Sequence, residues 1–294
     1  MPRTAFCVRF CVALSAQQGD NLRSFGNTKL WCHLSLDSGE QFTNKEIRES
    51  TPAKIPNFRE LVKAVAKIAN HNPDYSLFFR GQAKDYKLNS GSSSFYPTIF
   101  RSPSRSLMTK ELEARYQNLE NCSSDLLAKL DDLDIDNINK LKKFPELPWS
   151  ILQHYEVCGT PLLDFTHSLR VAASFAGNDA TDSANIFVFA FPYPNGIISY
   201  STEEELLNVR LLSACPAEAL RPHFQEGFLL GSFPPRVKRK QPFLDFGRRL
   251  IAKFEIPKKS FWGKDFHAIP RTALYPPDDE IETICTEIKS KYGT

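Results

Sequence analysis

The segment Tyr75-Ser76-Leu77-Phe78-Phe79-Arg80-Gly81-Gln82, residues 75–82, joins a short apolar run to an arginine and a glycine. The apolar run predicts a short strand that delivers Arg80 and Gly81 at its exit. A charged side chain directly after a buried strand is costly unless it is paired or meets an anion. Arginine offers a planar fork of donors that suits phosphate or carboxylate, and Gly81 lets backbone or ligand approach closely. Taken alone, the segment favours a structural salt bridge at a strand end.

The elements around this strand follow one another irregularly. Apolar spacing predicts helices at about 56–70, 107–130, 149–155, 169–176 and 279–292, with a short helix inside 131–147. Strands are predicted within 29–36 and at 161–165, 185–191, 197–200, 228–233 and 250–256. Because strands and helices do not alternate steadily, the predicted class is α+β, with mixed or antiparallel sheets and flanking helices.

Length and composition indicate a globular chain. Its 294 residues are 41% hydrophobic and 24% charged, which allows a sizeable core. We expect an irregular lead-in over residues 1–55 and one domain over 56–294. The net charge of +3 is too small to imply nucleic acid by itself. One basic run, residues 236–240, could bind phosphate, although a solvated loop is the simpler interpretation.

Cysteine usage and hydropathy predict a cytoplasmic protein. The seven cysteines are scattered, without a C-x-x-C or a zinc-like spacing, as expected in a reducing compartment. We expect no metal site and no membrane partner, since no apolar stretch reaches the roughly 18 residues of a membrane span. The start of the chain faintly resembles a signal peptide, but Arg9 interrupts its apolar core.

Two further polar clusters lie downstream of Arg80. The first borders a strand-to-helix junction and contains Gln153, His154, Asp164, Thr166 and Ser168. A helix cap explains one hydroxyl of this set, and a lone histidine is more often part of a core than a catalyst. The second cluster combines Asn208-Val209-Arg210 with Phe224-Gln225-Glu226-Gly227-Phe228. Ordinary turn chemistry and a side chain aimed into a cleft explain this second cluster equally well.

In this order, the three clusters resemble the FRG domain, a family named for the Phe-Arg-Gly that stands here at 79–81. The family combines F-R-G-Q, Y-x-L and I/L-F-R with Q-H-Y-G-x-x-T-R-L-L-D-[WF]-[ST], an alanine-phenylalanine helix, R…Q-x-G-x-F and a closing I-P. The matching residues are 80–82, 86–88, 99–101, Gln153, His154, Tyr155, Thr160, 162–166, 171–176, Arg210, Gln225, Gly227, Phe228 and 256–257. The resemblance covers about residues 57–290. It departs from the pattern in one extra residue between Tyr155 and Thr160, and in Pro161, where arginine is commoner.

The chain also resembles arginine-type ADP-ribosyltransferases, which implies an ADP-ribosyltransferase-like core and NAD as substrate. Their Ser-Thr-Ser and V-A-x-x-F-A signatures are similar to Thr166-His167-Ser168 and residues 171–176. Their catalytic glutamate lies near the start of a late strand, where Gln225 and Glu226 stand. Adjacent strand residues face opposite sides, so only one of this pair can point inward.

The resemblance assigns roles to individual residues. Arg80 would hold the dinucleotide's phosphates, Thr166 and Ser168 would fix the ribose, and an acid would stabilise an oxocarbenium-like state. The residues expected to bind NAD or ADP-ribose are Arg80, Gly81, Gln82, Gln153, His154, Asp164, Thr166, Ser168 and Arg210. The residues expected to act in catalysis are Arg80, Gln225 and Glu226.

Three functions follow as hypotheses. The first is an NAD-dependent ADP-ribosyltransferase or NAD glycohydrolase in a toxin or phage-defence setting, which implies an antitoxin or defence partner. The second is a non-catalytic module that binds a nucleotide or ADP-ribose. An acid that faces Arg80, whether Glu226 or one of residues 203–205, would favour the enzyme over the module. The third is a nucleic-acid adaptor that uses the basic run 236–240. The sequence does not identify an acceptor as protein or nucleic acid.

Overall fold

The structure is a computed structural model that describes residues 25–102, 107–133, 135, 138–178, 180–192, 196–264 and 266–293. The signal-peptide-like start of the chain lies outside the described residues. Within them, every helix is too short or too polar to cross a membrane.

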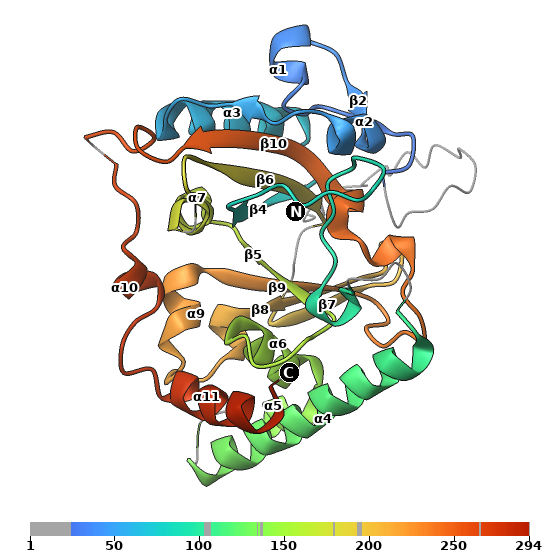
Figure 1. The fold of residues 1–294 in the computed structure, drawn as a ribbon, viewed down its shortest axis with the longest axis vertical. Coiled ribbons are helices and arrows are strands. Elements are labelled where there is room, and N and C mark those ends of the chain that lie inside the picture. The colour runs from blue at the N-terminus through green and yellow to red at the C-terminus, as the bar shows by residue number, and fades with distance from the viewer. Residues whose placement is uncertain are drawn as a thin grey trace, which may run out of the picture.

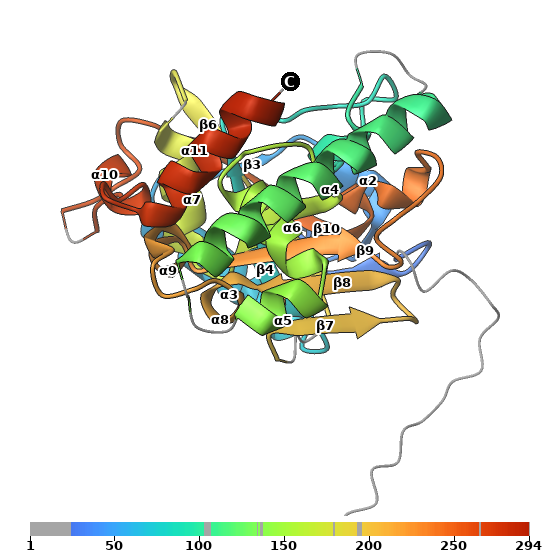
Figure 2. The same ribbon diagram turned by 90° about the horizontal axis from the view of Figure 1, so that it is seen from below.

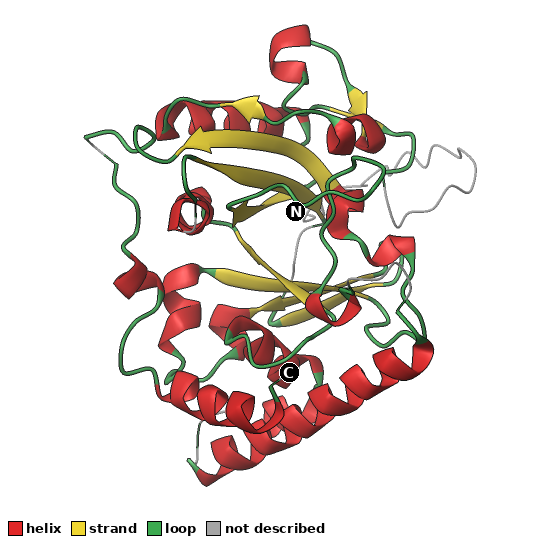
Figure 3. Ribbon diagram, viewed as in Figure 1, coloured by secondary structure: helices red, strands yellow, loops and turns green. Residues whose placement is uncertain are grey.

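One eight-stranded sheet runs through the described part of the molecule (Figures 1 and 3). All neighbouring strands pair antiparallel except the pair formed by residues 53–54 and 250–257, which is parallel. Helices flank the sheet, so the predicted α+β class is confirmed. In spatial order the strands are β3 (Ala53–Lys54), β10 (Leu250–Pro257), β6 (Ser183–Phe191), β4 (Ser76–Gln82), β5 (Leu162–Thr166), β9 (Gly227–Ser232), β8 (Leu206–Arg210) and β7 (Ile198–Ser201).

The sheet divides between β4 and β5. Strand β4 pairs with β6 along its whole length, from Ser76 to Gln82, but it pairs with β5 only at Phe79↔Thr166. Figure 1 shows β10, β6 and β4 in one half and β9 and β8 in the other, with β5 crossing between them. The two strands therefore separate immediately beside Arg80, the residue after Phe79.

Each half of the sheet has its own helices and core. The first half carries α2 (Asn44–Glu49), α3 (Phe58–His71) and α7 (Leu169–Asn178), whereas the second carries α4 (Thr109–Asp132), α5 (Ile138–Lys143), α6 (Glu146–His154) and α11 (Glu280–Tyr292). In Figure 2, α4 and α11 lie against each other beneath the second half. Alternate residues of β5 serve both cores, since Leu163 faces the first core and Leu162 the second.

Short elements complete the fold: β1 (Lys29–Leu30), α1 (Ser35–Ser38), β2 (Phe42–Thr43), η1 (Thr98–Phe100), α8 (Leu211–Ala214), α9 (Leu220–Gln225), η2 (Pro242–Leu244), η3 (Phe246–Arg249) and α10 (Arg271–Leu274). Each predicted helix has a counterpart in the structure. One prediction about strands is wrong, because Arg80 lies inside β4, opposite Phe187, rather than at the strand's exit. The sequence also did not predict β2, β3 or β8. It missed β8 because Asn208 and Arg210 made it resemble a polar turn.

The described part of the expected lead-in, residues 25–55, contains regular elements. Strand β3 joins the main sheet beside β10, and Ile47 and Ile55 are buried in the first core. The domain boundary near residue 55 stays a prediction, but these residues pack with the elements that follow them.

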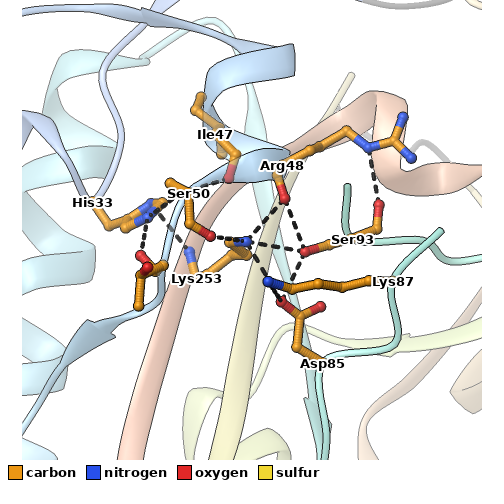
Figure 4. A network of polar contacts seen from close by, with 9 residues as sticks. His33, Ile47, Arg48, Ser50, Asp85, Lys87, Ser93 and Lys253 are labelled. Atoms are coloured by element: carbon orange, nitrogen blue, oxygen red, sulfur yellow. Dashed lines mark hydrogen bonds and ion pairs between the residues drawn. The ribbon is translucent and has the colours of Figure 1, made fainter. Parts of the chain in front are cut away.

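A buried lysine fixes the loop between β4 and η1 (Figure 4). Lys253 of β10 is fully buried, and its Nζ donates to the backbone oxygens of Ser50, at 2.6 Å, and Arg48, at 3.0 Å. The same Nζ donates to Ser93 Oγ at 3.0 Å and approaches the carboxylate of Asp85 at 3.5 Å. One ammonium group therefore connects β10 to the end of α2 and to the loop of residues 83–97.

Candidate functional site

Two adjoining cavities lie where β4 and β5 separate. The first has a volume of about 490 Å³ and the second about 760 Å³. Arg80, Gly81, Gln82, Ala83, Arg101 and Glu156 line both. The cavities therefore form one cleft along the break in the sheet, with Arg80 in the wall that they share.

Arg80 presents a charged side chain to the first cavity. Its Nη1 donates to the backbone oxygen of Asp164 at 2.5 Å. Its Nε is buried and has no hydrogen-bond partner among the described residues. Burial lowers the pKa of Arg80 to about 10, with nearby Arg101 lowering it and Asp164 opposing the shift. The guanidinium is thus a cation at neutral pH, with donor capacity left for an anion.

The Asp164 carboxylate holds α6 against β5. It accepts a hydrogen bond from Gln153 Nε2 at 2.8 Å, and its Oδ1 lies 3.2 Å from His154 Nδ1. Burial raises the pKa of Asp164, but His154, Arg80 and Gln153 together outweigh burial and lower it. The carboxylate is therefore ionised and places the His154 donor proton on Nδ1. His154 Nε2 is buried and without a partner in the described part of the chain.

Gln153 extends this network to two threonines, of which Thr98 also lines the first cavity. Its Oε1 accepts hydrogen bonds from Thr160 Oγ1 at 2.6 Å and from Thr98 Oγ1 at 3.2 Å. The Gln153 carbonyl oxygen is thereby used by the two threonines, and one of its two N–H donors is used by Asp164. Gln153 thus orients Asp164 and keeps a second N–H donor.

Gly81 allows α7 to pack directly on β4. A Cβ atom at this position would lie 1.9 Å from the backbone oxygen of Ala172. No side chain fits there, so the glycine serves a close approach of backbone to backbone. The next residue, Gln82, has a buried Oε1 with no partner among the described residues. Gln82 is therefore a polar group of the cleft that a ligand could use.

Arg221 and Glu156 also line the first cavity. Arg221, on α9, is buried between the rings of Tyr155 and Tyr275, whose centroids lie 5.4 and 4.3 Å from its Cζ. Its Nη2 lies 3.8 Å from Glu156 Oε1. The Glu156 side chain is 69% exposed. Its backbone is left-handed, with φ of 56°. An acid therefore lines the cleft at a position that sequence reasoning did not select.

The structure brings most predicted site residues to the first cavity. Those that line it are Arg80, Gly81, Gln82, Gln153, His154, Asp164, Thr166 and Gln225. The hydroxyl of Thr166 is already engaged, because it donates to the Gln225 backbone oxygen and accepts from the Ser168 N–H, both at 3.0 Å. Ser168 lines neither cavity, and its Oγ accepts from the Val171 N–H at the start of α7.

Gln225 and Glu226 do not lie within strand β9, contrary to what the sequence had suggested. Gln225 ends α9, and its Nε2 donates to the backbone oxygen of Leu274 at 2.7 Å. Glu226 is exposed and left-handed, with φ of 48°, and lines neither cavity. The expectation that the two residues alternate on a strand is wrong, because a helix end and a turn separate them from β9.

The other distant candidates also lie away from the cleft. Arg210 is exposed at the end of β8, opposite Phe228 of β9. Glu204 forms an ion pair with Arg249, and residues 203–205 line neither cavity. The acids that line the first cavity are therefore Asp164 and Glu156, both within the stretch from Gln153 to Ser168.

The chain was compared with models of known protein families. Residues 75–185 match the family model of the FRG domain. Searches of curated proteins and of solved structures found no match to the chain. The FRG segment runs from β4 to β6 and contains Arg80, Gln153, His154 and Asp164. Glu156 stands next to Tyr155, where the FRG pattern has glycine. Its positive φ is the conformation that glycine adopts most easily, so the departure from the pattern was the available signal for this residue.

Proposed function

We propose that the chain binds NAD in the first cavity and breaks its nicotinamide–ribose bond, by ADP-ribosyl transfer or by hydrolysis. The observation that carries the proposal is the half-buried Arg80 cation, whose buried Nε has no partner among the described residues, in a cavity of about 490 Å³ also lined by a carboxylate. The pyrophosphate of a dinucleotide is an anion that matches an arginine fork. The ADP-ribosyltransferase-like core that the sequence suggested belongs to this proposal.

The other groups of the cavity fit the parts of the substrate. The rings of Phe175 and Tyr275, with centroids 5.9 Å apart, offer an aromatic wall for the nicotinamide. Gln82 Oε1 can accept a hydrogen bond from a ribose hydroxyl. Cleavage builds positive charge on the ribose, and the Glu156 carboxylate can stabilise that charge. We therefore assign the acidic role to Glu156 in place of Gln225 or Glu226.

The second candidate is a module that binds ADP-ribose or a related nucleotide without cleaving it. The arrangement of Gln225 and Glu226 favours it: Gln225 is uncharged and bonded to Leu274, and Glu226 lies outside the cleft. Under this alternative Arg80 still binds phosphate. The toxin or phage-defence setting, with its antitoxin or defence partner, stays a prediction under both candidates.

Incubation with labelled NAD tests the proposal. Wild-type protein, Arg80→Ala and Arg210→Ala are compared for nicotinamide release and for label transfer. Arg210→Ala is the matched control, because it removes an exposed arginine that lines neither cavity. The proposal expects activity that depends on Arg80 and not on Arg210. No nicotinamide release, with Arg80-dependent binding of ADP-ribose retained, would favour the module. Absence of both would exclude both candidates.

A further inference from the structure

The second cavity has a wall of its own. Beyond the residues it shares with the first, it is lined by Tyr86, Lys87 and Tyr96 from the loop 83–97, and by Lys240. Lys240 is the last residue of the basic run 236–240, so this run ends at the cleft. The loop is held in place by the buried ammonium group of Lys253 (Figure 4). The cavity is therefore a built extension of the NAD cleft.

Cations dominate the lining of the second cavity. Arg80, Lys87, Arg101 and Lys240 face the single shared carboxylate of Glu156, and Lys87 also approaches Asp85 at 4.0 Å. Four positive charges against one lining carboxylate select for an anion.

Tyr96 positions two of these cations. The Arg101 Nε donates to the Tyr96 backbone oxygen at 2.9 Å, and Lys240 Nζ lies 4.1 Å from the centroid of the Tyr96 ring. Contacts with Tyr96 therefore set the distance between the charges of Arg101 and Lys240.

An exposed aromatic ring indicates which class of anion this cavity binds. Tyr86 is 61% exposed and lines this cavity, so its ring is available to a ligand. Nucleic-acid bases stack on such rings while cations hold the phosphates, and this combination characterises surfaces that bind single strands. An acidic peptide would use the charges but leave the ring without a partner. Lys238 and Arg239 are exposed and continue the positive charge outward.

We propose that the second cavity binds single-stranded nucleic acid, with phosphates on Arg101, Lys240 and Lys87 and a base on Tyr86. A strand held there would present its next nucleotide to the wall shared with the first cavity. If the proposed NAD cleavage is correct, on which this extension rests, the strand is the acceptor.

The transfer step balances for such an acceptor. Nicotinamide leaves with the electron pair of the broken C–N bond. A nitrogen or oxygen of the nucleotide forms the new bond to the ribose carbon. Its proton passes to the Glu156 carboxylate and then to water.

Binding is tested without NAD, by fluorescence anisotropy with a labelled oligothymidylate of about 12 nucleotides. The variants are Tyr86→Ala and the double change Arg101→Gln with Lys240→Gln. The matched control is Lys63→Gln, which removes an exposed cation of α3 that lines neither cavity. We expect Tyr86→Ala to weaken binding about fivefold or more. We expect the double change to weaken it about tenfold or more and to reduce the salt slope by about 1.4.

Three outcomes would overturn the inference: no binding by the wild type at about 50 mM salt, an equal loss in Lys63→Gln, or equally effective competition by an oligoglutamate peptide of the same charge. Nicotinamide release is measured on the same preparations without the oligonucleotide. Binding that depends on Tyr86, together with absent nicotinamide release, would reject the proposed enzyme and keep this inference. Arg80-dependent nicotinamide release without oligonucleotide binding would do the reverse.

Discussion

The guanidinium of Arg80 reaches across the break in the sheet to the backbone of Asp164, with Nη1 2.5 Å from the Asp164 oxygen. The backbone pairing between β4 and β5 is limited to Phe79↔Thr166. The side chain of the next residue, Arg80, therefore makes a hydrogen bond between the two strands where their backbone pairing has ended. The same contact leaves Nε without a partner among the described residues. Arg80 thus joins the two halves of the sheet and supplies the cleft with a half-buried cation.

Replacing Arg80 by methionine should separate these two roles. Arg80→Met loses one hydrogen bond to a carbonyl but also removes a desolvated charge, so the free energy of unfolding should fall by no more than about 2 kcal/mol. Affinity for ADP-ribose should fall about tenfold or more, and Arg80→Lys should recover only part of it because the ammonium lacks the fork. Urea denaturation and calorimetric titration measure the two effects. Unchanged ADP-ribose affinity in Arg80→Met would contradict the assignment.

Gly81 should tolerate no larger residue. In Gly81→Ala the new methyl group would lie 1.9 Å from the Ala172 backbone oxygen, and α7 would have to move off β4. We expect a loss of about 3 kcal/mol in the free energy of unfolding. Gly159→Ala is the matched control, because its nearest neighbour would lie 3.4 Å away, an ordinary contact. Its effect should stay within about 0.5 kcal/mol. Equal midpoints for the two variants in urea would contradict the packing role of Gly81.

The sequence predicted local elements well because their signals are local. The apolar spacing from Phe58 to Ile68 and the run from Ile186 to Phe191 depend on near neighbours alone, and both elements are present as predicted. Strand β8 was missed because Asn208 and Arg210 suggested a turn, whereas both lie in a strand that pairs with β9. Polar residues in such a strand are explained only by its neighbours in the sheet.

The candidate site was predictable in part for the same reason. Gln153, His154 and Asp164 were selected as a group, and hydrogen bonds join them. The pair Gln225 and Glu226 was misjudged because a strand was assumed where α9 ends in a left-handed residue. Only the three-dimensional structure shows that Glu156, which precedes β5, lies in the cleft beside Arg221.

The ammonium group of Lys253 should be essential to the loop of residues 83–97. Lys253→Met removes the donor of the Ser50 backbone oxygen and the cation beside Asp85, whereas the Arg48 oxygen keeps the Ser93 N–H, and the change should cost about 3–5 kcal/mol. Trypsin should then cleave faster at Lys84 or Lys87, which lie in the freed loop. Lys63→Met, a change of an exposed lysine, should alter stability by less than about 0.5 kcal/mol. Unaltered cleavage in a folded Lys253→Met protein would show that the loop is held by other contacts.

His33 should make the protein less stable in mild acid. Burial and then the charge of Lys253 lower the pKa of His33 from 6.5 to about 4. Between pH 6.5 and about pH 4, His33 is protonated in the unfolded chain but not in the folded protein. The contribution of His33 to the free energy of unfolding is therefore full above pH 6.5 and decreases as the pH falls toward 4. His33→Gln should flatten the pH dependence of the unfolding free energy by up to about 1.4 kcal/mol per pH unit in this window. Urea denaturation at several pH values checks this, and an unchanged slope would contradict it.

Glu156 and Glu226 permit a paired test of the cleft, because the same substitution at each should have the same structural effect. Both residues are left-handed, with φ of 56° and 48°. Glycine adopts this conformation without the cost that a Cβ imposes, so Glu156→Gly and Glu226→Gly should each leave the protein as stable as the wild type or stabilise it by about 1 kcal/mol. A loss of activity in either variant could then not be attributed to unfolding.

The two substitutions should differ in their effect on NAD. Glu156 lines the cleft, whereas Glu226 lines neither of its cavities. If the Glu156 carboxylate stabilises the developing ribose cation, Glu156→Gly should slow nicotinamide release by about 100-fold or more, and Glu226→Gly should leave it unchanged. Binding of ADP-ribose, which we propose to depend on Arg80, should survive in both. The reverse pattern, with activity lost in Glu226→Gly and kept in Glu156→Gly, would return the acidic role to the residue that the sequence first suggested.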